Sequence, residues 1–306
     1  MQRPIIVLGM HRSGTSLVAE LVGKWGAFGN DQFLPTDSRN PQGYWEYAPL
    51  VHFNRRLLAS IGSQSFLPPS DQDTDALVGR ASDPAWRNEA SQLIAAMESG
   101  KRAWYWKDPR LSVMLPFWQK MWDDAVYVVT VREPLDTALS LKKRDNLPLS
   151  AAILLWQRYM TTILRCTETR PRRLFIQYER ILSEPVEECR RLCGFLEEHC
   201  GADDTQPSGQ RVDSMLKAVN PKLRSHANGG ALFSSSEVTE EQKNLYKYLR
   251  SRGQSLDERF DPGAFNIYPG WRDYLRALVT LEQAREALRR EEERRQQPLA
   301  LKIRHK

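Results

Sequence analysis

The pattern of apolar and polar positions predicts short buried strands that alternate with helices. Apolar runs of strand length occupy residues 4–8, 103–106, 125–131 and 174–178, and the third is the richest in β-branched side chains. The first run leads into a helical repeat of apolar positions that ends at Gly26: Leu17, Val18, Leu21, Val22 and Trp25. Strands separated by helices predict an α/β fold with a central parallel sheet and right-handed crossovers.

Helical spacing divides much of the remaining chain. Residues 29–44 and 63–83 are polar or rich in turn-forming residues and are expected to be irregular. Residues 271–306 predict one long helix with a leucine stripe and a charged face. We therefore expect one domain over residues 1–270 and a charged helical extension over 271–306. Within the domain, helices are expected at residues 45–61, 84–99, 112–122, 134–141, 150–166, 184–199, 211–219 and 239–251.

The net charge of +6 is concentrated at the C-terminal end. Residues 271–306 hold ten Lys/Arg and six Asp/Glu, which leaves 34 against 32, or +2, for the other 270 residues. That small excess argues against nucleic-acid binding by the main domain. No apolar run approaches the ~20 residues of a membrane helix, and the N-terminus has the pattern of a strand rather than of a signal peptide. The cytoplasm is the expected location.

The cysteines do not form a usual metal-binding pattern. Cys189, Cys193 and Cys200 fall in one predicted helix beside His199, and Cys166 is separate. Their spacing, C-x3-C-x6-C, differs from the usual zinc-ligand spacings. Buried free thiols are therefore the simpler interpretation.

A glycine-rich loop joins the first strand to the first helix. The loop reads GMHRSGTS, in which Gly9 and Gly14 have the spacing of the phosphate-binding motif G-x-x-x-x-G-K-[ST] and Ser16 takes the place of its last hydroxyl. Thr15 stands where that motif has lysine. Backbone N–H groups and the helix N-terminus would still surround an anion. Arg12, inside the loop, offers two donors to an oxyanion.

A second phosphate-binding element is expected at the end of the third strand. The sequence VVTVREPLDTALSL puts Arg132 at the tip of the strand and Ser140 about two turns into the next helix. The strand ends in Arg132 and Glu133 rather than in an aspartate that would hold magnesium. A cradle of arginine and hydroxyl groups suits sulfuryl transfer, because the migrating group carries less charge than a phosphoryl group. Donors aimed at the leaving phosphate can then stabilise the transition state.

Together these motifs resemble those of P-loop sulfotransferases that use 3′-phosphoadenosine 5′-phosphosulfate (PAPS). The likeness covers about residues 4–200. It is closest to bacterial-type members with three motifs, which read here GMHRSGTS, NPQGYWE and KDPR at residues 9–16, 40–46 and 107–110. The resemblance implies a three-layer P-loop-like fold, PAPS as the donor, adenosine 3′,5′-bisphosphate as the product, and no metal.

The resemblance also implies the residues of the cofactor site. The loop that holds the 5′-phosphosulfate corresponds to five consecutive residues: Arg12, Ser13, Gly14, Thr15 and Ser16. His11 lies beside them, as a further contact or as a brace of the turn. The resemblance assigns the 3′-phosphate to Arg132 and Ser140. Tyr178, in FIQYERIL, is expected near the adenosine, and Arg224 falls where related enzymes have a basic loop that closes over the cofactor.

The acceptor hydroxyl must lose a proton, so a carboxylate or an imidazole is expected nearby. Family members use Glu or His for this step. Glu46, at the end of the PQGYWE turn, is the first candidate, although its place at an expected helix start counts against it. His52 and His11 are the other candidates, each with an ordinary structural role as the alternative. Lys107 could contact the sulfuryl group or an anionic acceptor, whereas Arg110 suits the turn before the next helix.

Two other functions stay open at this point. One is a P-loop kinase with a displaced lysine, against which the missing G-K-[ST] and the missing acid both speak. The other is a non-enzymatic nucleotide-binding scaffold that docks through its C-terminal helix. For the sulfotransferase, the expected acceptor is a hydroxyl of a carbohydrate or small molecule. A dimer through the C-terminal helix is an option that no other feature of the sequence supports.

Overall fold

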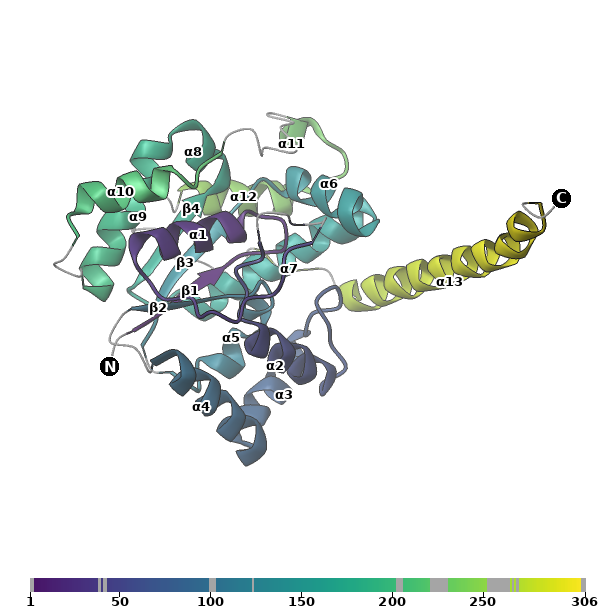
Figure 1. The fold of residues 1–306 in the computed structure, drawn as a ribbon, viewed down its shortest axis with the longest axis horizontal. Coiled ribbons are helices and arrows are strands. Elements are labelled where there is room, and N and C mark those ends of the chain that lie inside the picture. The colour runs from purple at the N-terminus through teal and green to yellow at the C-terminus, as the bar shows by residue number, and fades with distance from the viewer. Residues whose placement is uncertain are drawn as a thin grey trace. The chain divides into compact units, whose positions relative to one another are not determined.

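The computed structural model describes residues 3–37, 40, 43–98, 103–122, 124–201, 206–220, 231–251, 265, 267 and 270–303. Contacts within the chain divide it into two compact units, Met1–Ile267 and Tyr268–Lys306. The first unit contains the sheet, and the second contains the helix α13 (Trp271–Ile303) (Figure 1).

Among the described residues, the sheet has four strands in the order β2–β1–β3–β4, each parallel to its neighbours. The strands β1 and β3 are central and buried along their whole length. The predicted α/β fold with a central parallel sheet is confirmed, and every predicted strand agrees with an observed one to within one residue at either end. The strands are β1 (Pro4–Leu8), β2 (Trp104–Lys107), β3 (Val126–Val131) and β4 (Arg173–Gln177).

Helices flank the sheet (Figure 1). Helices α1 (Thr15–Trp25) and α9 (Pro185–Cys200) both pack on α10 (Ser208–Leu216), while α5 (Leu111–Trp118) packs on α7 (Leu149–Thr167). The other helices of this unit are α2 (Ala48–Ala59), α3 (Asp71–Ser82), α4 (Pro84–Glu98), α6 (Pro134–Asp145), α8 (Tyr178–Ser183), α11 (Ala231–Ser234) and α12 (Glu240–Ser251).

Alternating strand residues form the core under α1, α9 and α10. Ile5 and Val7 of β1 join Val126 and Val128 of β3 in one buried cluster, because residues two apart on a strand share a face. Leu192 of α9 belongs to the same cluster. Burial of each such side chain stabilises the fold by about 1.5–3 kcal/mol. This packing holds the sheet rigid, and the carboxyl ends of its strands carry the loops described below.

The expectation of an irregular segment over residues 63–83 is wrong, because α3 lies within it. Ser70 and Asp73 form a capping box in which each side chain accepts the other residue's N–H, at 3.2 and 2.8 Å. Only Leu77 and Ala81 of this helix are buried. The apolar periodicity is therefore weak, and the capping sequence S-x-x-D was the signal that could have revealed the helix.

The helix expected over residues 45–61 begins later, at Ala48. Trp45 has a left-handed backbone with φ of 54°, and Tyr47 is extended, so neither can belong to the helix. Pro49 then occupies the first turn, where its missing N–H costs nothing. Glu46 consequently precedes the helix rather than standing in its first turn.

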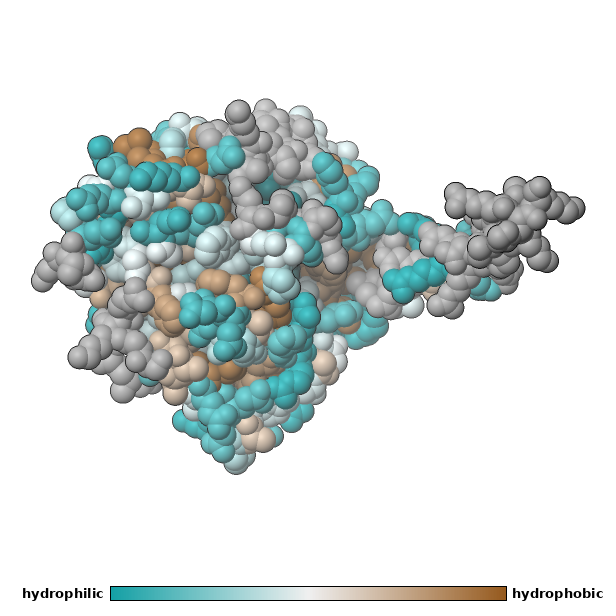
Figure 2. All heavy atoms as spheres, in the orientation of Figure 1, coloured by the Kyte–Doolittle hydropathy of each residue, from teal (hydrophilic) through white to brown (hydrophobic). Residues whose placement is uncertain are grey.

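The surface seen in Figure 2 mixes hydrophilic and hydrophobic residues, with hydrophilic side chains gathered over α3 and α4. Within the described ranges, no helix combines the length and the hydropathy that crossing a bilayer requires. In the second unit, Tyr274, Leu281 and Leu288 of α13 are exposed.

Candidate active site at the carboxyl ends of the strands

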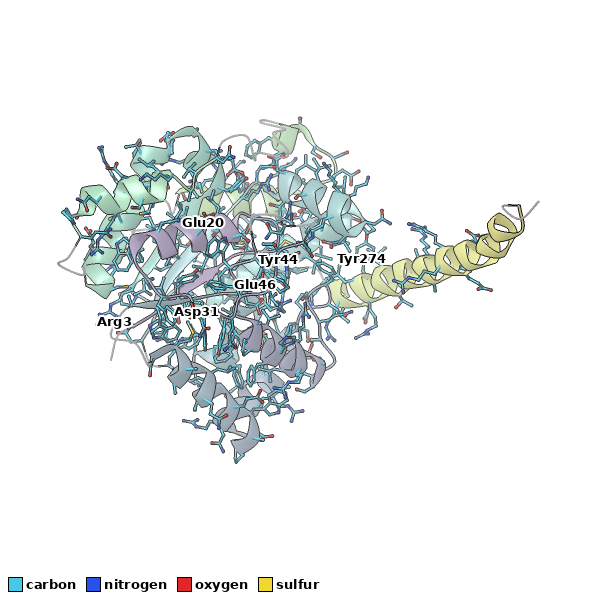
Figure 3. All side chains as sticks on the ribbon, in the orientation of Figure 1. Arg3, Glu20, Asp31, Tyr44, Glu46 and Tyr274 are labelled. Atoms are coloured by element: carbon cyan, nitrogen blue, oxygen red, sulfur yellow. The ribbon has the colours of Figure 1, made fainter. Side chains whose placement is uncertain are left out.

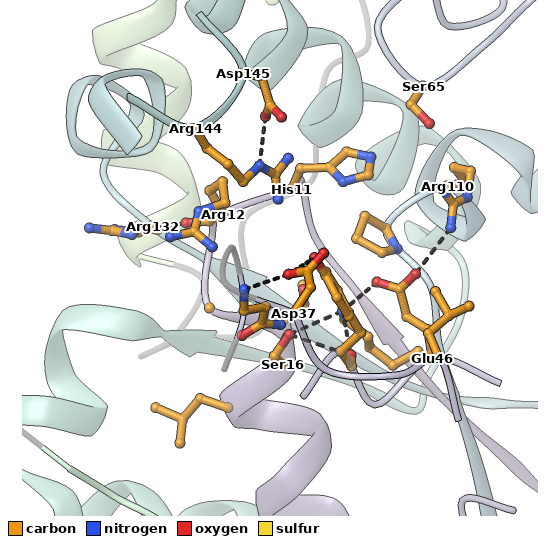
Figure 4. Close-up of a pocket in the computed structure, with 18 of the residues that line it drawn as sticks. His11, Arg12, Ser16, Asp37, Glu46, Ser65, Arg110, Arg132, Arg144 and Asp145 are labelled. Atoms are coloured by element: carbon orange, nitrogen blue, oxygen red, sulfur yellow. Dashed lines mark hydrogen bonds and ion pairs between the residues drawn. The ribbon is translucent and has the colours of Figure 1, made fainter. Parts of the chain in front are cut away.

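A cavity of about 600 Å³ lies at the carboxyl ends of the four strands (Figure 4). Each strand contributes through its end or the segment after it: the glycine loop after β1, Lys107 of β2, Arg132 after β3 and Tyr178 after β4. The segment before α2, which includes Glu46, completes a wall. Ligands of open parallel sheets bind at this edge, so the topology itself marks the cavity as the candidate site.

The glycine loop has a conformation that requires its glycines. Gly9 and Gly14 have φ of 146° and 93°, in the region that favours glycine, and Arg12 between them has φ of 67°. A Cβ atom on Gly14 would lie 2.2 Å from Cδ2 of Tyr178. Ser13 braces the turn, since its N–H and its hydroxyl both donate to the carbonyl oxygen three residues earlier, at 3.2 and 2.6 Å.

The loop opens directly into the N-terminus of α1. The helix begins at Thr15, so the N–H groups of its first turn have no partner within the helix. Gly14 occupies the N-cap position and provides no side-chain cap. Thr15 and Ser16 line the cavity. Free N–H groups at the positive end of a helix dipole make this end of the cavity suitable for an anion.

The second predicted motif is joined to the first by hydrogen bonds. Arg12 Nε donates to Ser140 Oγ at 2.9 Å, and Arg132 Nη1 donates to the carbonyl oxygen of Arg12 at 2.9 Å. The guanidinium of Arg132 lies over the ring of Tyr178, 4.6 Å from its centroid. Arg132 and Ser140 are both 3% exposed. The four residues that the sequence predicts for the cofactor site therefore lie beside one another.

The Arg132 guanidinium has donors that no described residue accepts. Its Nε and Nη2 atoms are buried, and neither has a hydrogen-bond partner among the described residues. Buried donors are rarely left unsatisfied in proteins, because each one costs about 1–3 kcal/mol when its partner is missing. An anionic ligand with oxygens at this position would satisfy both nitrogens, so the residues fit a second phosphate.

Lys107 supplies the ammonium group that Thr15 does not. Its Nζ atom lies 3.2 Å from Ser16 Oγ and donates to the carbonyl of Tyr44 and to Glu46 Oε1, both at 2.8 Å. The side chain of Lys107 is 3% exposed. Tyr44 and Glu46 lie close together in the segment before α2 (Figure 3). An ammonium group therefore sits at the first turn of α1, although Thr15 occupies the usual lysine position.

Glu46 is held by two cations. Its Oε1 pairs with Lys107, and its Oε2 accepts from Arg110 Nη2 at 3.0 Å (Figure 4). Arg110 also donates from Nε to Asp108 at 3.0 Å, and Asn54 Nδ2 donates to the same carboxylate at 2.9 Å. Asp108 thus fixes Arg110 as well as the turn. Each carboxylate oxygen of Glu46 is paired with a cation, so Glu46 positions the ammonium group of Lys107.

His11 and His52 lie in different surroundings. Burial lowers the pKa of His11 well below its ordinary value, and the nearby cation of Arg110 adds to the effect, so the imidazole is neutral at pH 7. Its Nε2 atom is buried with no hydrogen-bond partner in the described part of the chain, and His11 lines the cavity. His52 is exposed on α2 and is not among the residues that line the cavity.

Some predicted residues lie elsewhere and some lining residues were not predicted. Ser13 braces the loop without lining the cavity, and Arg224 lies outside the described residues. Arg144 and Asp145, an ion pair at 2.7 Å, line the cavity but were missed. Arg144 follows Ser140 by one helical turn, and this spacing was the available signal.

The fold and the site together define an α/β protein with two adjoining anion-binding elements at one edge of a parallel sheet. The model of the sulfotransferase family matches residues 4–200, and the chain belongs to that family. No curated protein sequence is a significant match.

Solved structures similar to this chain include three sulfotransferases. Sulfotransferase STF9 from Mycobacterium avium is 18% identical with a TM-score of 0.49, and the match covers 84% of this chain and 79% of that one. The sulfotransferase domain from the curacin biosynthetic pathway is 17% identical with a TM-score of 0.48, covering 82% and 98%. The sulfotransferase domain of the Synechococcus PCC 7002 olefin synthase is 17% identical with a TM-score of 0.46, covering 82% and 96%. Likeness this distant says nothing of the donor or the acceptor.

Proposed function

We propose that this sulfotransferase takes its sulfuryl group from PAPS and transfers it to a hydroxyl of a carbohydrate or small molecule. The observation that carries the proposal is Arg132, whose buried Nε and Nη2 have no hydrogen-bond partner among the described residues and which lies beside the bond between Arg12 and Ser140. A donor with a phosphate at each end of its ribose would engage both anion-binding elements. The acceptor class rests on the family alone.

The chain's own residues would bind such a donor in two places. The first turn of α1, with Thr15 and Ser16, would hold the 5′-phosphosulfate. Arg132 would hold the 3′-phosphate, Ser140, which does not itself line the cavity, would hold Arg12 beside it, and Tyr178 would lie near the adenosine. Bound PAPS would supply a sulfuryl group on a good leaving phosphate. A nucleotide with a single phosphate would occupy only one of the two elements.

Transfer would be assisted by fixed positive charge. Lys107 and Arg12 stand at the loop where negative charge grows on the leaving phosphate, and Lys107 is buried, so its charge acts at short range with little screening. These two cations would perform the neutralisation that metal ions perform in phosphoryl transfer. We therefore propose in-line displacement without a divalent metal.

Glu46 remains the proposed base, because it lines the cavity beside Lys107. Proton transfer to it would require an incoming hydroxyl to displace one of its two cationic partners. His11 is the alternative, since a neutral imidazole with an unpartnered Nε2 can accept a proton. His52 is no longer proposed, because it is not among the residues that line the cavity.

The kinase alternative has less support. The residue after β3 is Arg132, and Glu133 directs its carboxylate to the N–H of Asp136, at 2.6 Å, as the cap of α6. Glu133 lines a second cavity rather than the first.

The four cysteines are free thiols, which supports our proposal of a reducing, cytoplasmic setting.

The proposal is tested by sulfuryl transfer. The full chain is incubated with PAPS labelled in its sulfate and with pools of sugars, phenols and aliphatic alcohols, with and without EDTA. A parallel reaction contains ATP labelled in its γ-phosphate, with magnesium. We expect labelled sulfate on an acceptor, unaffected by EDTA, and no labelled phosphate. Transfer from ATP alone would overturn the proposal.

A further inference from the structure

The backbone that carries Arg132 leaves the sheet one residue earlier. The last residues of β3 and β4 to pair are Val131 and Gln177, and α6 begins at Pro134. The peptide between Arg132 and Glu133 therefore has neither a strand partner nor a helical one. Together with the preceding peptide, which belongs to the end of β3, it fixes the backbone from which the Arg132 side chain leaves.

Two side chains hold both polar groups of this peptide. Trp156 Nε1 donates to the carbonyl oxygen of Arg132 at 3.1 Å, and the N–H of Glu133 donates to Glu179 Oε1 at 3.0 Å. The carbonyl and the N–H belong to one planar unit. A bond at each edge of that plane fixes its rotation, which a single bond would not do.

The two clamping residues come from different elements. Trp156 lies on α7 and is fully buried. Glu179 lies in the first turn of α8, directly after Tyr178, whose ring packs against the Arg132 guanidinium. The dipeptide Tyr178–Glu179 thus supports Arg132 twice, at its guanidinium through the ring and at its backbone through the carboxylate.

Glu179 lies along a different cavity from Arg132. The second cavity, of about 780 Å³, is lined by Glu179 and Glu133, and Glu179 does not line the first. Burial raises the pKa of Glu179, because a charged carboxylate loses hydration free energy when it is removed from water. A carboxylate acceptor at this position therefore lowers the stability of the fold. The effect of Glu179 on a ligand of Arg132 would pass through the Arg132–Glu133 peptide and through the attraction between its carboxylate and the Arg132 guanidinium, not through contact with the ligand.

We infer that Glu179, together with Trp156, is a positioning residue that aims Arg132 and thereby sets the preference for a nucleotide with a 3′-phosphate. The inference rests on the proposed function, because it takes the ligand of Arg132 to be that phosphate. Glu179 itself would touch neither the nucleotide nor the acceptor.

The test measures dissociation constants of adenosine 3′,5′-bisphosphate and adenosine 5′-phosphate by calorimetry. The ratio of the two constants reports the 3′-phosphate preference. The variants are Glu179→Ala, which removes the acceptor, Glu179→Gln, which keeps an oxygen for the Glu133 N–H, and Trp156→Phe, which removes only the indole donor. Glu187→Ala, an exposed acid on α9, is the matched control. Thermal unfolding of each variant checks that it is folded.

We expect Glu179→Ala and Trp156→Phe each to reduce the preference about tenfold, the loss of one well-placed bond to a charged or polar group. Glu179→Gln should restore most of it, Glu187→Ala should leave it unchanged, and 5′-phosphate affinity should stay within about twofold. Added to Arg132→Ala, Glu179→Ala should have no further effect.

An unchanged preference in folded Glu179→Ala and Trp156→Phe would overturn the inference while leaving the proposed function intact. Equal weakening of both nucleotides would also overturn it, because a general disturbance of the fold would then be the cause. A wild-type chain with no preference for the bisphosphate would instead overturn the proposed function, and the role of Glu179 with it.

Discussion

Lys107 Nζ lies 3.2 Å from Ser16 Oγ, although 91 positions separate the two residues in the chain. They meet because β1 and β2 are parallel neighbours whose register pairs Val7 with Lys107. The end of β2 thus brings an ammonium group beside the glycine loop. The ammonium group that is missing at Thr15 therefore comes from another strand.

The first prediction concerns that charge. Lys107→Met should lower turnover by ~10²–10³, the usual effect of removing one fixed donor to developing negative charge. Lys120→Met, an exposed lysine after α5, should have normal turnover. Steady-state sulfate transfer measures both. If Lys107→Met retained more than about half of the wild-type turnover, Lys107 would have only a structural role beside Glu46.

The second prediction concerns the proton acceptor. Glu46→Gln should cut turnover by ~10²–10⁴ while nucleotide affinity is preserved, because the amide cannot take a proton from the acceptor. His11→Asn should have a smaller effect. Single-turnover rates and nucleotide titrations separate the two quantities. The opposite order of effects would assign proton removal to the His11 imidazole.

The third prediction concerns the shape of the loop. Gly14→Ala should abolish nucleotide binding, because its Cβ would lie 2.2 Å from Tyr178 Cδ2 at a φ of 93°. Gly79→Ala, in α3, meets no atom within 4 Å and should stabilise the chain by about 0.4–1 kcal/mol. Urea unfolding and nucleotide titration of both variants check this contrast. Wild-type binding by Gly14→Ala would mean that the loop conformation is not needed.

The fourth prediction concerns pH. Burial raises the pKa of Glu133 to about 7. At Glu133 the folded chain therefore binds more protons than the unfolded chain between about pH 4.5 and 7, so the contribution of this group to stability falls as the pH rises through that window. Glu133→Gln keeps an oxygen for the α6 cap and removes the titration. It should be more stable than wild type by about 1 kcal/mol at pH 8, after allowance for partial exposure, and equal to it at pH 4.5.

Urea unfolding at the two pH values measures this difference. Glu98→Gln, an exposed acid at the end of α4, serves as the control and should follow the wild type at both values. Parallel pH profiles for Glu133→Gln and wild type would show that Glu133 does not titrate in this range.

Local patterns predicted the sheet, and they placed the glycine loop and Arg132 at the ends of its strands. The runs around Val128 and Ile176 are short and rich in β-branched or aromatic side chains, and such segments have few alternatives to a buried strand. The places of Gly9 and Gly14 could also be predicted locally, because the turn needs backbone conformations that favour glycine. Arg132 could be predicted because the strand before it ends clearly. The helix α3 was missed because only two of its apolar side chains are buried.

The contacts across the cavity could not be predicted in the same way. The pairing of Glu46 with Lys107 and Arg110 depends on where the segment before α2 folds back, and no local pattern encodes that path. No local pattern predicts that His52 is exposed, or that two donors of Arg132 lack a partner among the described residues. The orientation of the Arg132–Glu133 peptide requires three elements at once, which only the folded chain brings together.

A nucleotide titration followed by thermal unfolding tests whether the cavity is built for a PAPS-type ligand. Wild type and Arg132→Ala are titrated with adenosine 3′,5′-bisphosphate and, separately, with ATP and magnesium. At a hundred times its dissociation constant the bisphosphate should stabilise wild type by ~2.7 kcal/mol. It should stabilise Arg132→Ala far less at the same concentration, and ATP with magnesium should stabilise neither chain. Stabilisation of wild type by ATP with magnesium, and none by the bisphosphate, would contradict the proposed donor.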